Sequence, residues 1–142
     1  MQSEAKSLSV QQNLGYLPAK KESSPLASWS GDQDSLSPTA QQSLLADEDS
    51  FENVWKVLEP GKLAPAVDFT TQAVVFLEAG LEPTPGYAIR ILQMEDKPDK
   101  LVVHWKETQP GSDTVAAQVV TYPWILQVID KPSKPVTFTQ DE

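Results

Sequence analysis

The chain has 142 residues, a formal net charge of −9 and no cysteine. Its length suits one domain with its own core, and its acidity argues against nucleic acid and anionic membrane surfaces as partners, because both attract clusters of Lys and Arg. The absence of thiols excludes disulfides, cysteine nucleophiles and cysteine metal sites. No window approaches the roughly 18 apolar residues of a transmembrane helix, so we expect no direct insertion into a membrane.

The first third of the chain has little regular pattern. Residues 1–12 are mostly polar, and such a segment cannot repay the entropy of ordering, so we expect a flexible leader. Between residues 13 and 46, short apolar groups at 14–17 and 26–29 alternate with turn formers, which predicts two or three short strands. We expect residues 13–142 to form a single β-rich domain.

One short helix is expected at about residues 48–58. Its apolar side chains recur at the spacing of a single helical face: Phe51, Val54, Trp55 and Leu58. Asp49 or Ser50 can cap the first turn, and a Glu-Pro-Gly sequence at 59–61 ends the helix. Because a helix this short is not stable alone, we expect its apolar face to pack on a sheet.

After residue 65 the pattern changes to strands separated by turns. Six strands are predicted, at residues 72–79, 87–95, 100–109, 114–122, 124–130 and 136–139. The connections contain Pro and Gly and are too short for crossover helices, so we expect antiparallel pairing. The fold class is therefore mostly β: an antiparallel β-sandwich or a partly open barrel with one short α-helix packed on it.

Residues suited to catalysis or metal binding are scarce. His104 is the only histidine, and strand alternation places it with Arg90 and Lys106 on the face opposite Trp105, which favours a surface position. The acidic residues at 32–34 and 47–49 lack the spacing of a calcium loop, and no serine lies in a nucleophile elbow. We predict no catalytic residue, no metal site and no cofactor, and we do not expect an enzyme.

Two motifs stiffened by proline are the candidates for partner binding. The first comprises Glu82, Pro83, Thr84, Pro85, Gly86 and Tyr87, and the second comprises Tyr122, Pro123 and Trp124. A rigid loop loses little entropy when a partner binds, and aromatic side chains are typical anchors of interfaces. Each motif also has a plain structural explanation: a tight strand connection for the first, and core packing of Trp124 for the second.

The order of the predicted strands suggests where these two motifs lie. Both motifs precede strands, and sandwiches gather their loops at two ends. We therefore expect them on neighbouring loops at one end of the β domain, with Thr84 exposed. Pro85 and Gly86 suit the centre of a type II turn, in which Gly86 takes a positive φ.

Between about residues 47 and 139, a series of motifs follow one another in a specific order. It contains the tryptophan helix, Pro-Ala-Val-Asp-Phe at 65–69, Val-Val-Phe at 74–76, the first proline motif, Leu-Val-Val at 101–103, Pro-Gly at 110–111, Gln-Val-Val-Thr-Tyr-Pro at 118–123 and Val-Thr-Phe at 136–138. In this order the segment resembles the PrcB-like C-terminal domain, a family named for a subunit of a bacterial protease complex.

The resemblance implies a secreted or envelope protein, often a lipoprotein, that stabilises or assembles a protease. It implies an extracytoplasmic location, in the periplasm or cell envelope, and is compatible with a lipid anchor in the native precursor. The first residues lack the basic start and apolar stretch of a signal peptide. We therefore expect this chain to be the mature portion of an exported protein.

A second resemblance is to chagasin-type inhibitors of cysteine proteases, which are Ig-like sandwiches that insert a loop into the active site of the target. The matching residues are Pro83, Thr84, Gly86 and Tyr87 in the first loop and Pro123 and Trp124 in the second, whereas Glu82, Pro85 and Tyr122 depart from the inhibitor motifs. Three functions follow: a protease-associated adaptor or stability subunit first, a loop-wedge protease inhibitor second, and a purely structural envelope module third.

Overall fold

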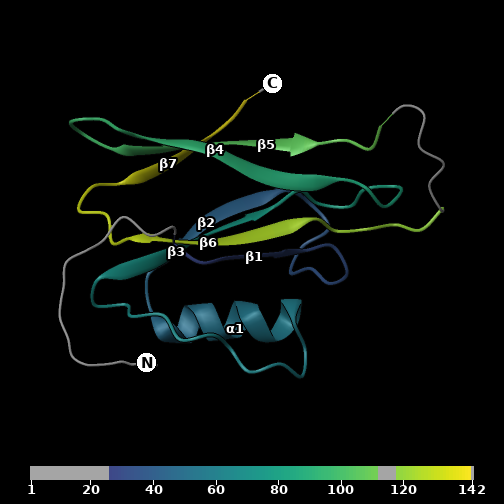
Figure 1. Ribbon diagram of the computed structural model, residues 1–142, viewed down its shortest axis with the longest axis horizontal. Helices are drawn as coiled ribbons and strands as arrows, with labels where there is room; N and C mark the ends of the chain where they lie inside the picture. Colours follow the sequence, from purple (N-terminus) through teal and green to yellow (C-terminus); the bar gives the residue numbers. More distant parts are fainter. Residues whose placement is uncertain (1–25, 112–117, 142) are drawn as a thin grey trace.

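The computed structural model describes residues 26–111 and 118–141 (Figure 1). Within these ranges the strands are β1 (Ser28–Gly31), β2 (Gln41–Leu45), β3 (Gln72–Glu78), β4 (Ala88–Asp96), β5 (Leu101–Thr108), β6 (Trp124–Asp130) and β7 (Val136–Gln140). The helix α1 spans Glu48–Leu58, between β2 and β3. The predicted mostly β class is confirmed, and the helix lies where the sequence places it.

The elements form three layers (Figure 1). A four-stranded middle sheet, in the order β1-β6-β3-β2, has α1 on one face and a three-stranded outer sheet, in the order β4-β5-β7, on the other. The described strands form two open sheets and do not close into a barrel. Of the two expected architectures, the sandwich is the one observed.

The middle sheet separates two hydrophobic cores. Val74 and Phe76 of β3 face α1, whereas Ala73, Val75 and Leu77 face the outer sheet. A strand that is covered on both faces carries a continuous apolar run instead of an alternating pattern. The apolar run of β3 therefore places this strand between the layers.

The helix is held by its apolar stripe. Phe51, Trp55 and Leu58 are all at most 6% exposed and pack on the middle sheet. Trp29 of β1 meets Trp55 edge-on, with 5.8 Å between the ring centroids. Burial of each large apolar side chain contributes about 1.5–3 kcal/mol, so the sheet supplies most of the stability of this short helix.

The capping residue differs from the one predicted. Asp47 is the N-cap, and its carboxylate accepts a hydrogen bond from the Ser50 N–H at 2.8 Å. This bond from Ser50 holds the pKa of Asp47 below its ordinary value. Asp49 instead lies in the first turn beside Glu48, where a carboxylate interacts favourably with the positive end of the helix dipole.

The expectation of antiparallel pairing is wrong for one pair of strands. β7 runs parallel to β5, with Leu101 opposite Val136 and Trp105 opposite Gln140. The chain leaves the outer sheet after β5, adds β6 to the middle sheet and then returns to the outer sheet. A strand of the other layer thus makes the crossover that parallel pairing needs, and no helix is required.

Among the remaining predictions for the chain ends and loops, one is wrong, two lie outside the described residues and one agrees with the structure. The strand predicted at 114–122 is wrong over its described residues, 118–122, where Thr121 makes an isolated bridge to Glu82. The leader at 1–12 and the apolar group at 14–17 lie outside the described residues. β1 and β2 agree with the two or three strands expected before the helix. No helix in the described ranges has the length and hydrophobicity to cross a membrane.

Candidate functional site

Three connections gather at one end of the sandwich (Figure 1). They join β1 to β2, β3 to β4 and β5 to β6, and from them we select residues 32–40, 80–87 and 118–123. We call this surface the loop end. Both of the predicted proline motifs lie in it, so the structure brings together the residues that the sequence selected.

Backbone hydrogen bonds hold these three segments to one another. Glu82 and Thr121 form a reciprocal bridge, with N···O distances of 2.8 and 2.9 Å. The Thr121 hydroxyl also donates to the Thr84 carbonyl at 3.1 Å. The first segment joins through two bonds, from the Leu81 N–H to the Pro38 carbonyl and from the Tyr122 N–H to the Asp32 carbonyl. The loop end is therefore a connected surface.

The predicted site residues differ in how much surface they offer. Pro83 and Gly86 are exposed, and Glu82, Thr84, Pro85, Tyr87 and Tyr122 are half-buried. Pro123 and Trp124 are buried, and Trp124 is only 2% exposed. Trp124 packs in the core beside α1, so its predicted role as a surface anchor is corrected: its ring stabilises the fold under the loop end. Thr84 is also less exposed than expected, because its carbonyl is bonded to Thr121.

Gly86 shows why the first motif needs a glycine. Its φ is +103°, in the region expected for the Pro85-Gly86 turn. A Cβ atom at this position would lie 2.8 Å from Cβ of Pro110, which follows β5. The turn therefore packs closely against the end of the outer sheet as well as against Thr121.

Sequence reasoning missed the apolar residues that surround the motifs. Leu36, Leu81, Val119 and Val120 are 42%, 49%, 56% and 51% exposed. All four belong to the segments of the loop end, where the fold leaves them exposed, and large apolar groups that a fold leaves exposed are candidates for contact with a partner. The signal was hidden because the Val-Val pair was assigned to a strand, where one of its two side chains would have been buried.

A pair of carboxyl groups lies beside the bridge. Glu107 continues the inward-facing row of β5 after Val103 and Trp105, and it contacts Glu82 of the loop end. Burial, together with the hydrogen bond and the charge of Glu82, raises the pKa of Glu107 to about 8. One oxygen, Oε2, is buried without a hydrogen-bond partner among the described residues. The loop end thus includes an acidic group with an unused acceptor.

The comparison with known families assigns this part of the chain. Residues 66–130 match the family model described as PrcB C-terminal. Over these residues the chain is similar to the PrcB C-terminal domain. No curated protein and no solved structure matches the chain. The match supports the first of the two resemblances found in the sequence and does not extend to the chagasin-type inhibitors.

The matched segment covers most of the candidate site. It runs from just before β3 to the end of β6, and so it includes both proline motifs, Glu107 and the exposed Val-Val pair. The connection at 32–40 lies outside it, as do α1 and β7. The central strands and two of the three connections at the loop end are therefore the part that the family model recognises.

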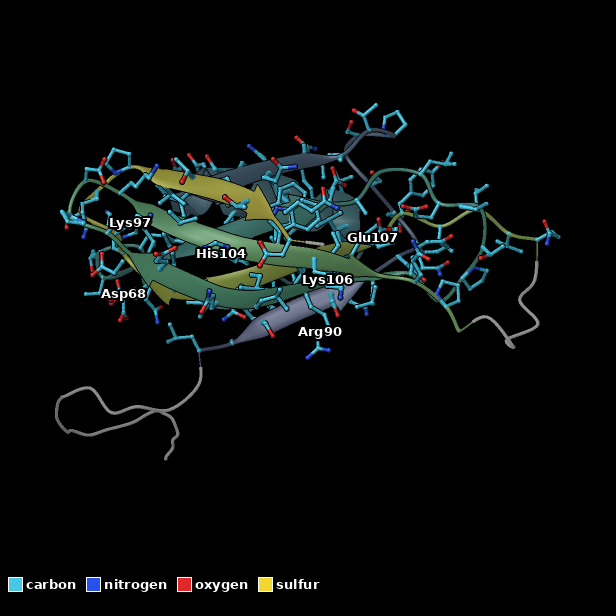
Figure 2. The ribbon with its side chains drawn as sticks, turned by 90° about the horizontal axis from the view of Figure 1, so that it is seen from above. Asp68, Arg90, Lys97, His104, Lys106 and Glu107 are labelled. Atoms are coloured by element: carbon cyan, nitrogen blue, oxygen red, sulfur yellow. The ribbon has the colours of Figure 1, made fainter. Side chains whose placement is uncertain are left out.

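A second cluster of charges lies on the outward face of the outer sheet (Figure 2). His104 lies between Glu95 and Asp141, with N···O distances of 3.1 and 3.2 Å. Hydrogen bonds to Glu95 and then to Asp141 raise the pKa of His104 above 6.5. Both ring nitrogens are engaged, so the imidazole ties β5 to β4 and to the end of β7. Among the described residues, no group of three His, Asp or Glu side chains is arranged to hold a metal ion.

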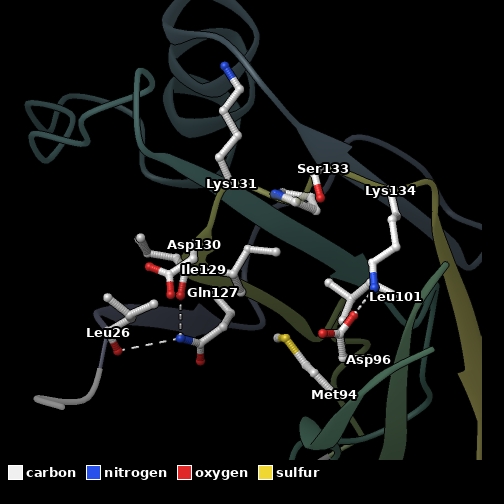
Figure 3. A pocket seen from close by; sticks show the side chains of 12 residues that line it. Leu26, Met94, Asp96, Leu101, Gln127, Ile129, Asp130, Lys131, Ser133 and Lys134 are labelled. Atoms are coloured by element: carbon white, nitrogen blue, oxygen red, sulfur yellow. Dashed lines mark hydrogen bonds and ion pairs between the residues drawn. The ribbon is translucent and has the colours of Figure 1, made fainter. Parts of the chain in front are cut away.

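A cavity of about 570 Å³ opens between the layers at the opposite end of the sandwich (Figure 3). Apolar side chains such as Met94 and Leu101 line it, and the two lysines at its rim already have partners. Lys134 binds Asp96 and Lys131 donates to a backbone carbonyl at 3.0 Å. Because its two lysines are already engaged and neither proline motif lines this cavity, the loop end remains the stronger candidate.

Proposed function

We propose that this protein is a non-enzymatic binding module that associates with a protease as an adaptor or stability subunit. The family matched by residues 66–130 carries the name of a protease-complex subunit. This similarity supports association with a protease complex. The loop end is the surface through which we propose that the partner binds.

One observation carries the proposal: the loop end displays large apolar side chains that the fold leaves exposed. Val119 and Val120 are adjacent in the chain and both more than 50% exposed, and Leu81, which is 49% exposed, precedes Glu82 of the Glu82–Thr121 bridge that joins their two segments. Interfaces bury such groups in their centre and surround them with polar atoms. The hydrogen bonds among the three segments preorganise this surface, which lowers the entropic cost of binding.

The chemistry of the chain supports a binding role over catalysis. It has one histidine and no cysteine, and both nitrogens of His104 are occupied by carboxylates. General-base catalysis would require a nucleophile or substrate within reach of a ring nitrogen. We also favour an adaptor over a loop-wedge inhibitor, because Trp124, which would contact the target in that mode, is buried.

The proposal places the protein outside the cytoplasm, in the periplasm or cell envelope. Its support is the similarity of residues 66–130 to the PrcB C-terminal family. Envelope fractions are therefore where the partner is to be sought.

Site-specific photocrosslinking tests the proposal. A photoreactive phenylalanine analogue is placed at Val120 in the loop end or, as the matched control, at Val57, which is 38% exposed on α1. After irradiation in cells, crosslinked proteins are identified by mass spectrometry. We expect a protease from Val120 and none from Val57. If both positions capture the same proteins, or Val120 captures no protease, the proposal is wrong.

A further inference from the structure

We infer that the loop end accepts a protein surface that combines apolar side chains with Arg or Lys. This inference rests on the proposed function and adds the chemistry of the partner to it.

The three segments of the loop end carry acidic groups only. Asp32, Asp34 and Glu82 occur in residues 32–40, 80–87 and 118–123, and these ranges contain no Lys and no Arg. Glu82 follows the exposed Leu81 and bridges to Thr121, which follows the exposed Val120, and Asp32 accepts a backbone hydrogen bond from Tyr122. An apolar centre with carboxylates at its edge is complementary to an apolar surface flanked by cations.

Glu107 adds a directional element. Its Oε2 atom is buried and lacks a hydrogen-bond partner within the described ranges. A buried acceptor without a partner is unfavourable, and a guanidinium or ammonium group from a partner would satisfy it with a charge-assisted bond. Such a cation would also favour the ionised form of Glu107, which burial and the neighbouring Glu82 disfavour.

Within the part of the chain that the structure describes, no Lys or Arg serves this acceptor. Arg90 and Lys106 pair with each other across β4 and β5, at positions that face outward, whereas Glu107 belongs to the inward-facing row (Figure 2). A second copy of this chain is a poor occupant, because its loop end would place carboxylates against carboxylates. An anionic lipid surface is disfavoured for the same reason.

Peptide binding to the full chain tests the inference. The probes are two blocked hexapeptides, one alternating Leu and Arg and one alternating Leu and Glu, followed by NMR on the ¹⁵N-labelled protein. We expect amide shifts at Leu81, Glu82 and Val120 with the basic peptide and none with the acidic one. The variant Asp34→Asn/Glu82→Gln should weaken binding about two- to thirtyfold, because it removes two exposed ion pairs, each of which contributes modestly.

A matched control separates this site from general attraction to an acidic chain. Glu48→Gln/Glu52→Gln removes the same charge from the exposed start of α1 and should leave the affinity unchanged. Equal weakening by both variants, shifts centred on α1, or equal binding of the two peptides would overturn the inference. The two experiments can fail separately. A protease crosslinked at Val120 with no preference for the basic peptide refutes only the inference. A preference for the basic peptide with no protease crosslinked at Val120 refutes only the proposed function.

Discussion

Glu107 stands where the alternation of β5 would place an apolar side chain. It follows Val103 and Trp105 on the face of β5 that points into the core between the two sheets, yet its neighbour is another carboxyl group, Glu82 of the β3–β4 connection. Desolvation disfavours the charged form of Glu107, and the neighbouring carboxylate does the same. The residue therefore connects the stability of the fold to pH at the surface that we propose for binding.

The raised pKa predicts a loss of stability with rising pH. The unfolded chain gives up the Glu107 proton near the ordinary value of 4.5, and the folded chain keeps it up to about pH 8. This contribution is full below pH 4.5 and disappears as the pH rises through 8. The free energy of unfolding should therefore decline with rising pH by about 1–2 kcal/mol less in Glu107→Gln than in the wild type. This range allows for solvent screening, because Glu107 is only partly buried. Urea unfolding at pH 5 and pH 9 measures this change in the free energy of unfolding, with Glu48→Gln as the control. If the wild type and both variants lose the same free energy between the two pH values, Glu107 is not the source of the decline.

His104 gives a second, independent pH dependence. Its pKa is raised above 6.5 by Glu95 first and Asp141 second, so its stabilisation is full below pH 6.5 and is lost as the pH rises through the folded value. NMR titration of the imidazole should show an apparent pKa above 6.5. Glu95→Gln should lower that pKa more than Asp141→Asn does, because Glu95 is the larger cause. The opposite order would contradict the geometry.

At the scale of elements, the sequence predicts what local pattern determines. The strands β3 to β7 and the helix lie within one or two residues of their predicted positions, because alternation, apolar runs and Pro-Gly turns are local signals. Parallel pairing of β7 could not be predicted in this way, since it depends on the layer that each strand joins. The same holds for Trp124, whose place in the core follows from the position of α1 beneath β6.

The connection between β3 and β4 offers a test by paired glycines. Gly61 and Gly86 both have positive φ, of 81° and 103°, but a Cβ at Gly61 would meet no atom within 4 Å and one at Gly86 would meet Pro110 at 2.8 Å. Gly61→Ala should cost about 1–2 kcal/mol from backbone strain alone. Gly86→Ala should cost more, because the loop must also move away from Pro110. Thermal unfolding measures both. Equal costs would show that the loop is free to shift.

At the scale of the whole molecule, β3 and β6 link the two cores. Successive residues of these strands enter opposite cores, so neither core can lose its packing while the other stays intact. The candidate site was recovered only in part from the sequence for the same reason: the loops were recognisable, but which of their side chains are exposed depends on layers assembled from distant segments. Leu36 illustrates this, since it reaches the loop end from the β1–β2 connection.

The shared strands predict cooperative unfolding. With 5-fluorotryptophan in place of the four tryptophans, ¹⁹F NMR reports Trp105 from one core and Trp55 from the other. Both resonances should disappear at the same urea concentration, as expected for two-state unfolding of one cooperative unit. Separate midpoints would mean that the layers unfold independently.

The position of β6 also determines when the sheets can form during synthesis. β6 pairs with β1, almost one hundred residues earlier, and the outer sheet is complete only when β7 has joined β5. The ribosome must therefore synthesise the chain as far as residue 130 before all four strands of the middle sheet can pair. It must reach residue 140 before the outer sheet has all three strands. Topologies dominated by such distant pairings fold in about milliseconds to seconds. The unpaired β-strands of the nascent chain would be exposed in that interval, when chaperones can bind them.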